Sequence, residues 1–105
     1  MNLDDLQIEP KRLTDICLRY RVAKLEVFGS FVAGEAGEAS DVDVLVTLEP
    51  DAGGGFEFIK LHRELEQALS RRVDLLTRQS VEQSPNKYFR RFALDQTVVV
   101  YEHAA

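Results

Sequence analysis

The segment from Asp41 to Leu48 constrains the fold more than any other part of the chain. Val42, Val44 and Val46 alternate with residues of other kinds along it. Because successive side chains of a β-strand point to opposite faces, this alternation gives the segment an apolar face that must be buried. We therefore predict a strand here, with its valines packed against another layer of the protein.

Helical and strand-like patterns alternate along the rest of the chain. Apolar residues at helical spacing predict a helix that begins near Pro10 and a second helix around Leu61 and Leu65. Short apolar runs predict three more strands, and an interruption is expected near Pro85. Together these patterns predict an α/β (α+β) fold with a sheet of about four strands covered by helices. In chain order we expect helices at 10–20, 31–36, 58–70 and 81–94, strands at 25–28, 42–48, 73–76 and 98–101, and a loop at 50–55.

The chain of 105 residues has room for one domain, which we expect to span residues 1–105. The net charge of -5 argues against a protein that binds nucleic-acid backbones, which requires a surplus of Lys and Arg. The longest apolar run, Val98 to Tyr101, is far shorter than the roughly 20 residues of a membrane span. The acidic start lacks the order of an export signal, and the single Cys17 suits a reducing compartment. We therefore expect a cytoplasmic protein with no membrane or nucleic-acid partner, and any second domain that selects a substrate must belong to another chain.

Basic residues gather late in the chain. Such a cluster on an acidic protein indicates either an anionic ligand or partner, or a solvated face, and the sequence leaves both open. Tyr88 lies among these residues and could stack on a base, although an aromatic residue in a helix is more often part of the core. The basic residues are Arg71, Arg72, Arg78, Lys87, Arg90 and Arg91.

Asp41 and Asp43 are two residues apart on the predicted strand, so their carboxylates project from the same face. Like charges this close repel each other and require a compensating cation when they are buried. Mg²⁺ is a suitable ion because it takes oxygen ligands and keeps positions open for substrate phosphates. The bare pattern fits an exposed strand edge or a turn as well, so the context must decide.

Three further features provide that context. Gly29 and Ser30 follow a predicted strand, where free backbone N–H groups can attract phosphate, although a tight turn capped by Ser30 is the simpler interpretation. Ser40 precedes the aspartate pair and could likewise be a turn residue. Asp74 projects from an otherwise apolar strand, where aspartate is disfavoured. If that strand lies beside the one at 42–48, three carboxylates converge, which is enough for two divalent ions.

The spacing of these residues resembles the nucleotidyltransferase motif of the DNA polymerase beta superfamily. Val27–Ser30 is followed, after ten residues, by Asp41–Val46, and Asp74 matches the third carboxylate of the family. Within the superfamily the chain is most similar to minimal nucleotidyltransferases, the antitoxins of HEPN/MNT toxin–antitoxin pairs. The resemblance extends from about Leu13 to Tyr101.

The resemblance implies a mixed sheet with flanking helices, two Mg²⁺ ions and ATP as the substrate. It also implies transfer of AMP to a tyrosine of a partner HEPN ribonuclease toxin, which is thereby silenced in a hetero-oligomer. By the same analogy Asp74 completes the second metal site and helps to activate the acceptor hydroxyl. The implied nucleotide-binding residues are Gly29, Ser30 and Ser40, and the implied catalytic and metal-binding residues are Asp41, Asp43 and Asp74.

One position departs from the family pattern. Members commonly read Gly-Ser-x-Ala-Arg-Gly, whereas this chain has Ala33 in place of the arginine. The loss of a cation near the phosphates weakens triphosphate binding or slows transfer, unless a late arginine substitutes. The departure keeps a second hypothesis open, in which a non-catalytic antitoxin inhibits the toxin by binding alone.

Other chemistries find less support in the sequence. An aspartyl-phosphate hydrolase requires an apolar strand leading into its first aspartate, and residues 38–40 do not supply one. His62 and His103 lack metal-ligand spacing, so we expect them at the surface or at its boundary. Cys17 lies on an apolar helical stripe and is expected to be a core residue.

Overall fold

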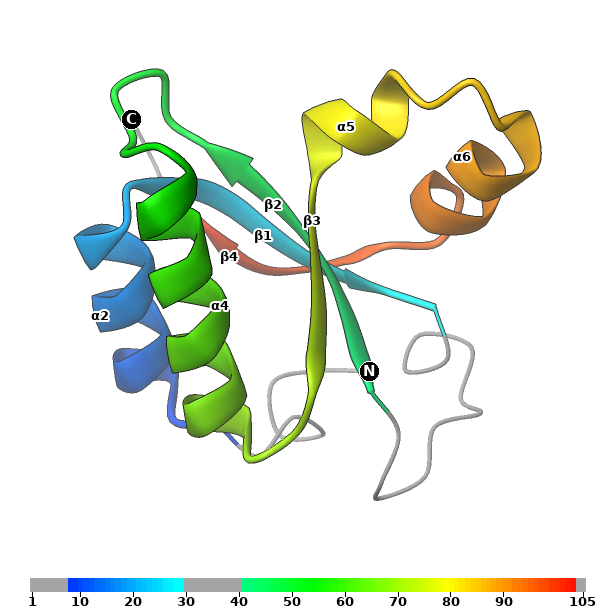
Figure 1. Ribbon diagram of the computed structural model, residues 1–105. Coiled ribbons are helices and arrows are strands. Elements are labelled where there is room, and N and C mark those ends of the chain that lie inside the picture. Colours follow the sequence, from blue (N-terminus) through cyan, green and yellow to red (C-terminus); the bar gives the residue numbers. More distant parts are fainter. Residues whose placement is uncertain (1–7, 30–40, 104–105) are drawn as a thin grey trace.

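The computed structural model describes residues 8–29 and 41–103 (Figure 1). The elements it contains are α2 (Pro10–Arg19), β1 (Val22–Phe28), β2 (Val42–Leu48), α4 (Gly55–Leu69), β3 (Val73–Thr77), α5 (Arg78–Glu82), α6 (Lys87–Leu94) and β4 (Val98–Glu102). All four predicted strands are confirmed, as are the two long helices. The short helix expected at 31–36 lies outside the described residues.

The starts of β1, α4 and α5 differ most from the sequence prediction, and α5 begins at Arg78 rather than at Val81. β1 begins at Val22 rather than at Leu25, because its antiparallel pairing with β2 extends back to that residue. α4 begins at Gly55, a residue that the sequence assigned to a loop. Its cap residue, Gly54, makes no side-chain cap hydrogen bond, so no capping residue in the sequence marks this start.

The strands form a mixed sheet in the order β3-β2-β1-β4. β1 pairs antiparallel with β2 and β4, whereas β2 and β3 are parallel. A parallel pair needs a crossover connection, and α4 provides it between β2 and β3. The topology confirms the mixed sheet with flanking helices.

The main core lies between the sheet and the two long helices. Figure 1 shows α2 and α4 side by side on one side of the sheet. The alternating valines of β2 face them, as the sequence predicted. Cys17 is fully buried here, and burial raises the pKa of its thiol to about 12. It is therefore an unreactive core residue.

The opposite face of the sheet is covered only in part, by α5 and α6. Leu45 of β2 is fully buried in a small second core with Phe28, Val81 and Ala93, so β2 packs on both faces. Asp43 shares the face of Leu45 because it lies two residues earlier on the strand. Asp43 is less buried than Leu45, because α5 and α6 cover the sheet less completely at the end that carries Asp43.

The interruption expected near Pro85 is confirmed, because α5 ends at Glu82 and α6 begins at Lys87. Asn86 caps α6: its side-chain oxygen accepts hydrogen bonds from the backbone N–H groups of Tyr88 and Phe89. This cap satisfies two of the donors that a helix start leaves free. The sequence therefore fixes the start of α6 locally.

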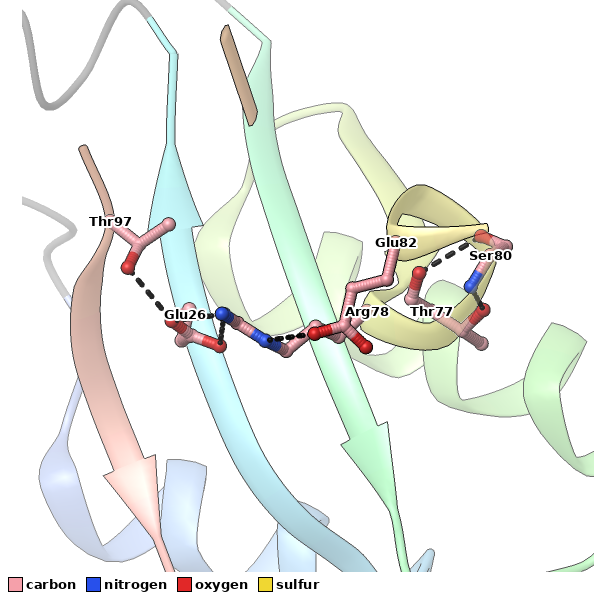
Figure 2. A network of polar contacts seen from close by, with 6 residues as sticks. All are labelled: Glu26, Thr77, Arg78, Ser80, Glu82 and Thr97. Carbon is pink, nitrogen blue, oxygen red and sulfur yellow. Dashed lines mark hydrogen bonds and ion pairs between the residues drawn. The ribbon is translucent and has the colours of Figure 1, made fainter. Parts of the chain in front are cut away.

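A buried charge holds α5 against the sheet. Glu26 of β1 is 2% exposed, and Nη1 of Arg78 lies 2.7 and 2.9 Å from its two carboxylate oxygens. Thr97 donates a hydrogen bond of 2.8 Å to the same carboxylate. Figure 2 shows that Arg78 reaches across β2 to Glu26, while Thr77 and Ser80 form the capping contacts of α5. The network joins β1, the first residue of α5 and the segment that leads into β4.

Within the described residues, no helix has the length and apolar character that crossing a membrane requires.

Candidate active site

Asp43 and Asp74 lie side by side at one end of the sheet. They are direct partners in the register of the parallel strands β2 and β3. Burial raises the pKa of Asp43 to about 6, and the carboxylates of Asp74 and Asp41 add to the shift. The sequence expected these three carboxylates to converge if the two strands were neighbours, and the register meets that condition.

Asp41 precedes β2 and is exposed. Arg72 Nε lies 3.6 Å from its Oδ1, so an arginine partly balances its charge. In the part of the chain that the structure describes, no group of three or more His, Cys, Asp or Glu side chains is arranged to hold a metal ion. Asp43 and Asp74 are thus paired at the site, whereas Asp41 contacts Arg72.

The donor set nevertheless fits a hard divalent cation. Carboxylate oxygens are the ligands that Mg²⁺ prefers, and Asp43 and Asp74 present theirs side by side from neighbouring strands. Burial is the main cause of the raised pKa of Asp43, and a divalent ion would offset the repulsion from Asp74 and Asp41 that adds to it. Asp43 and Asp74 could hold such an ion, and Asp41 could join them by giving up its long contact with Arg72.

Gly29 ends β1 in a conformation that favours glycine, with φ of +75°. A Cβ atom at this position would lie 2.2 Å from Oδ2 of Asp43. The main chain therefore passes directly against the carboxylate of Asp43. Phe28 pairs with Asp43 in the antiparallel register of β1 and β2, which brings the next residue, Gly29, to this position. Ser30 and Ser40, the other predicted nucleotide-binding residues, lie outside the described residues.

We expect Gly29→Ala to disturb this approach. The methyl group would displace the Asp43 carboxylate, and the left-handed backbone costs a residue with a side chain about 1–2 kcal/mol. Urea unfolding should show that loss in the free energy of unfolding, and catalysis that depends on Asp43 should fall more steeply. Ala substituted at the exposed Gly54, where a Cβ meets no atom within 4 Å, is the matched control. Unchanged stability and activity in Gly29→Ala would contradict the role given to this turn.

A hollow of about 280 Å³ opens beside Gly29. Its described lining comprises Gly29 and four residues in or just after α6: Arg91, Phe92, Asp95 and Gln96. Phe92 is 61% exposed and meets Phe28 edge-on, with ring centroids 6.2 Å apart. Gly29 also abuts Asp43, so this residue links the hollow to the carboxylate pair.

Sequence reasoning missed most of this lining. Arg91 stood out as one of several late basic residues, but Phe92, Asp95 and Gln96 carried no signal. Tyr88 is 73% exposed, so its assignment to the core was wrong: it lies on the side of α6 away from the buried Ala93.

The late basic residues serve different purposes. Arg78 pairs with the buried Glu26, and Arg90 donates a hydrogen bond to the carbonyl oxygen of Ser84. Arg72 lies near Asp41, and Arg91 lines the hollow. Some of these cations are therefore structural, while two lie at the candidate site.

The two histidines lie away from this site. His62 on α4 contacts the carbonyl oxygen of Val73 and lies 3.5 Å from Glu66, and His103 pairs with Glu49. Both are partly exposed, as the sequence predicted for boundary residues.

Comparison with known proteins identifies the family. The sequence profile described as "Nucleotidyltransferase domain" matches residues 10–100, which is most of the chain and includes Gly29, Asp43 and Asp74. The chain belongs to the nucleotidyltransferase domain family. The resemblance that the motif indicated is thereby confirmed.

Relatives of this nucleotidyltransferase include the protein adenylyltransferase MntA of Thermococcus cleftensis. The two are 46% identical over 63 residues, which are 60% of this chain and 63% of that protein. The matched region thus spans less than two thirds of the relative. Among solved structures, a candidate minimal nucleotidyltransferase has a TM-score of 0.69 and 30% identity, with coverage of 93% of this chain and 95% of that one.

Two solved toxin–antitoxin complexes share the fold of this nucleotidyltransferase. One contains AMP-PNP and matches with a TM-score of 0.66 and 19% identity, covering 91% of this chain and 75% of that one. The other joins the tri-AMPylated HEPN toxin of Shewanella oneidensis to an MNT antitoxin, with a TM-score of 0.59, 18% identity, and coverage of 93% and 73%. These two likenesses concern the fold.

Proposed function

We propose that this nucleotidyltransferase is an antitoxin that transfers AMP from ATP to a tyrosine hydroxyl of a partner HEPN ribonuclease toxin. The observation that carries the proposal is the Asp43–Asp74 pair, which lies beside the Gly29 turn and an adjoining hollow. The similarity to a protein adenylyltransferase, and to a fold found with an AMPylated HEPN toxin, supports the acceptor class. Residues 1–105 would act as one domain, in the cytoplasm and in a hetero-oligomer with the toxin.

The reaction exchanges one bond to phosphorus for another. The tyrosine oxygen bonds to the α-phosphorus of ATP, the bond from that phosphorus to the bridging oxygen breaks, and pyrophosphate leaves. The phenolic proton passes to a nearby base, a role for which Asp74 is placed because it is exposed beside Asp43. Gly29, and by analogy Ser30 and Ser40, would position the phosphates.

Divalent metal is part of the proposal. Asp43 and Asp74 would hold Mg²⁺ between the paired strands, and Asp41, once it gives up its contact with Arg72, would complete a set of three carboxylates for two ions. When bound, the ions neutralise phosphate charge and make the acceptor hydroxyl easier to deprotonate. The chain's own contribution is to keep Asp43 and Asp74 at a fixed separation on paired strands.

Mass spectrometry of the toxin tests the proposal. The purified protein is incubated with a HEPN toxin, ATP and Mg²⁺, and the mass of the toxin is then measured. We expect a mass gain of one or more AMP groups, located on tyrosine by peptide fragmentation, and a parallel loss of ribonuclease activity. No gain in mass would contradict the enzymatic function.

A non-catalytic antitoxin is the second candidate. Ala33 in place of the family arginine and the engagement of Asp41 with Arg72 favour it. In that case the toxin would lose ribonuclease activity in the complex while its mass stays constant. The same incubation without ATP separates the two: inhibition that needs no nucleotide indicates binding alone.

A further inference from the structure

Arg91 lies where it can meet the phosphates of a bound nucleotide. It lines the same hollow as Gly29, and Gly29 in turn lies against the Asp43 carboxylate. A phosphate chain that starts at the carboxylate pair and passes the glycine turn therefore reaches this hollow. No other arginine or lysine is part of its described lining.

The guanidinium of Arg91 is only weakly engaged. Its Nε lies 3.9 Å from Oδ2 of Asp95, and the side chains are 78% and 65% exposed. Exposed ion pairs one helical turn apart contribute little to stability, so an anion can replace this partner at little cost. Arg78 and Arg90, by contrast, are held by the Glu26 carboxylate and the Ser84 carbonyl oxygen.

The charge of the site favours such a cation. A nucleoside triphosphate brings several negative charges to an end of the sheet that already carries three carboxylates. Arginine binds phosphate oxygens through two parallel N–H donors, which supplies both charge and orientation. Ala33 supplies no charge, so the compensation has to come from elsewhere in the chain.

We propose that Arg91 binds the terminal phosphates of the nucleotide in the hollow beside Gly29, as a binding and orienting residue. The inference rests on the proposed function only in taking ATP as the nucleotide. Arg91 would thus be the late arginine that substitutes for the family arginine missing at Ala33. Asp95 is the weak ion-pair partner that the phosphate would replace.

Calorimetric titration with ATP and with AMP, both in Mg²⁺, tests this role. We expect Arg91→Gln to weaken ATP binding about tenfold or more, since a charged hydrogen bond is lost, and to change AMP binding less than about twofold. Arg91→Lys should recover part of the loss. Arg12→Gln, an exposed arginine on α2 across the sheet, is the matched control and should bind both as the wild type does.

The outcomes separate this inference from the proposed function. Wild-type ATP affinity in Arg91→Gln, or an equal loss for ATP and AMP, would overturn the phosphate contact. If ATP binding depends on Arg91 but the toxin gains no mass, the proposed transfer fails and the phosphate contact stands. A wild-type protein that binds no ATP overturns both. Thermal unfolding checks that each variant is folded.

Discussion

Asp43→Asn is expected to abolish AMP transfer while the protein stays folded. The substitution removes a carboxylate from the pair with Asp74, and with it a proposed ligand for the divalent ion. Losing metal stabilisation worth several kcal/mol in the transition state lowers the rate by a factor of about a thousand or more. Single-turnover transfer to the toxin, followed by mass, measures the effect.

In the absence of metal, the same variant should be slightly more stable than the wild type. Asp43 has a raised pKa because it is partly buried and faces two other carboxylates, so its ionised form is unfavourable in the folded state. At pH 8 the neutral amide removes that cost, which we place at about 1 kcal/mol once solvent screening is allowed for. Urea unfolding in EDTA measures it. The opposite signs of the two effects distinguish a functional residue from a structural one.

Asp15→Asn is the matched control, because Asp15 is an exposed carboxylate on α2 across the sheet. It should leave the transfer rate and the free energy of unfolding unchanged. Transfer at the wild-type rate in Asp43→Asn would refute the assignment of the site, and so would an equal loss of activity in the Asp15 variant.

The second large effect is expected for stability, at Glu26. Glu26→Gln removes the charge that pairs with Arg78 and leaves the guanidinium, whose side chain is 29% exposed, without its main partner. Breaking a buried ion pair on one side costs about 3–5 kcal/mol, and the partial exposure of Arg78 brings our expectation to about 2–3 kcal/mol. Chemical denaturation of the protein without ligands measures the change.

A double substitution provides the control for Glu26. Glu26→Leu combined with Arg78→Met replaces the pair by apolar side chains of similar volume, and such replacements are often neutral or stabilising. The double variant should therefore be more stable than Glu26→Gln. A loss below about 1 kcal/mol in Glu26→Gln would show that the network in Figure 2 contributes little to stability.

The sequence predicted the local elements of this protein well. Alternating valines identified β2 and the face that it buries, and helical spacing identified α2 and the middle of α4. These predictions succeeded because side-chain periodicity is a local property of a strand or a helix. The start of α4 at Gly55 could not be predicted, since glycine favours loops and no capping side chain marks it.

The sequence by itself determined the strands, the long helices and the motif to which Gly29, Asp43 and Asp74 belong. Only the tertiary structure decided that Asp43 faces Asp74, that Gly29 lies against Asp43, and that Arg91 borders the hollow beside them. The pairing of Glu26 with Arg78 was likewise decided only by the tertiary structure, because 52 residues separate the partners along the chain. The physical reason is common to all of them. Strand order and register depend on how the whole core packs, and no local pattern records which distant side chains that packing brings into contact.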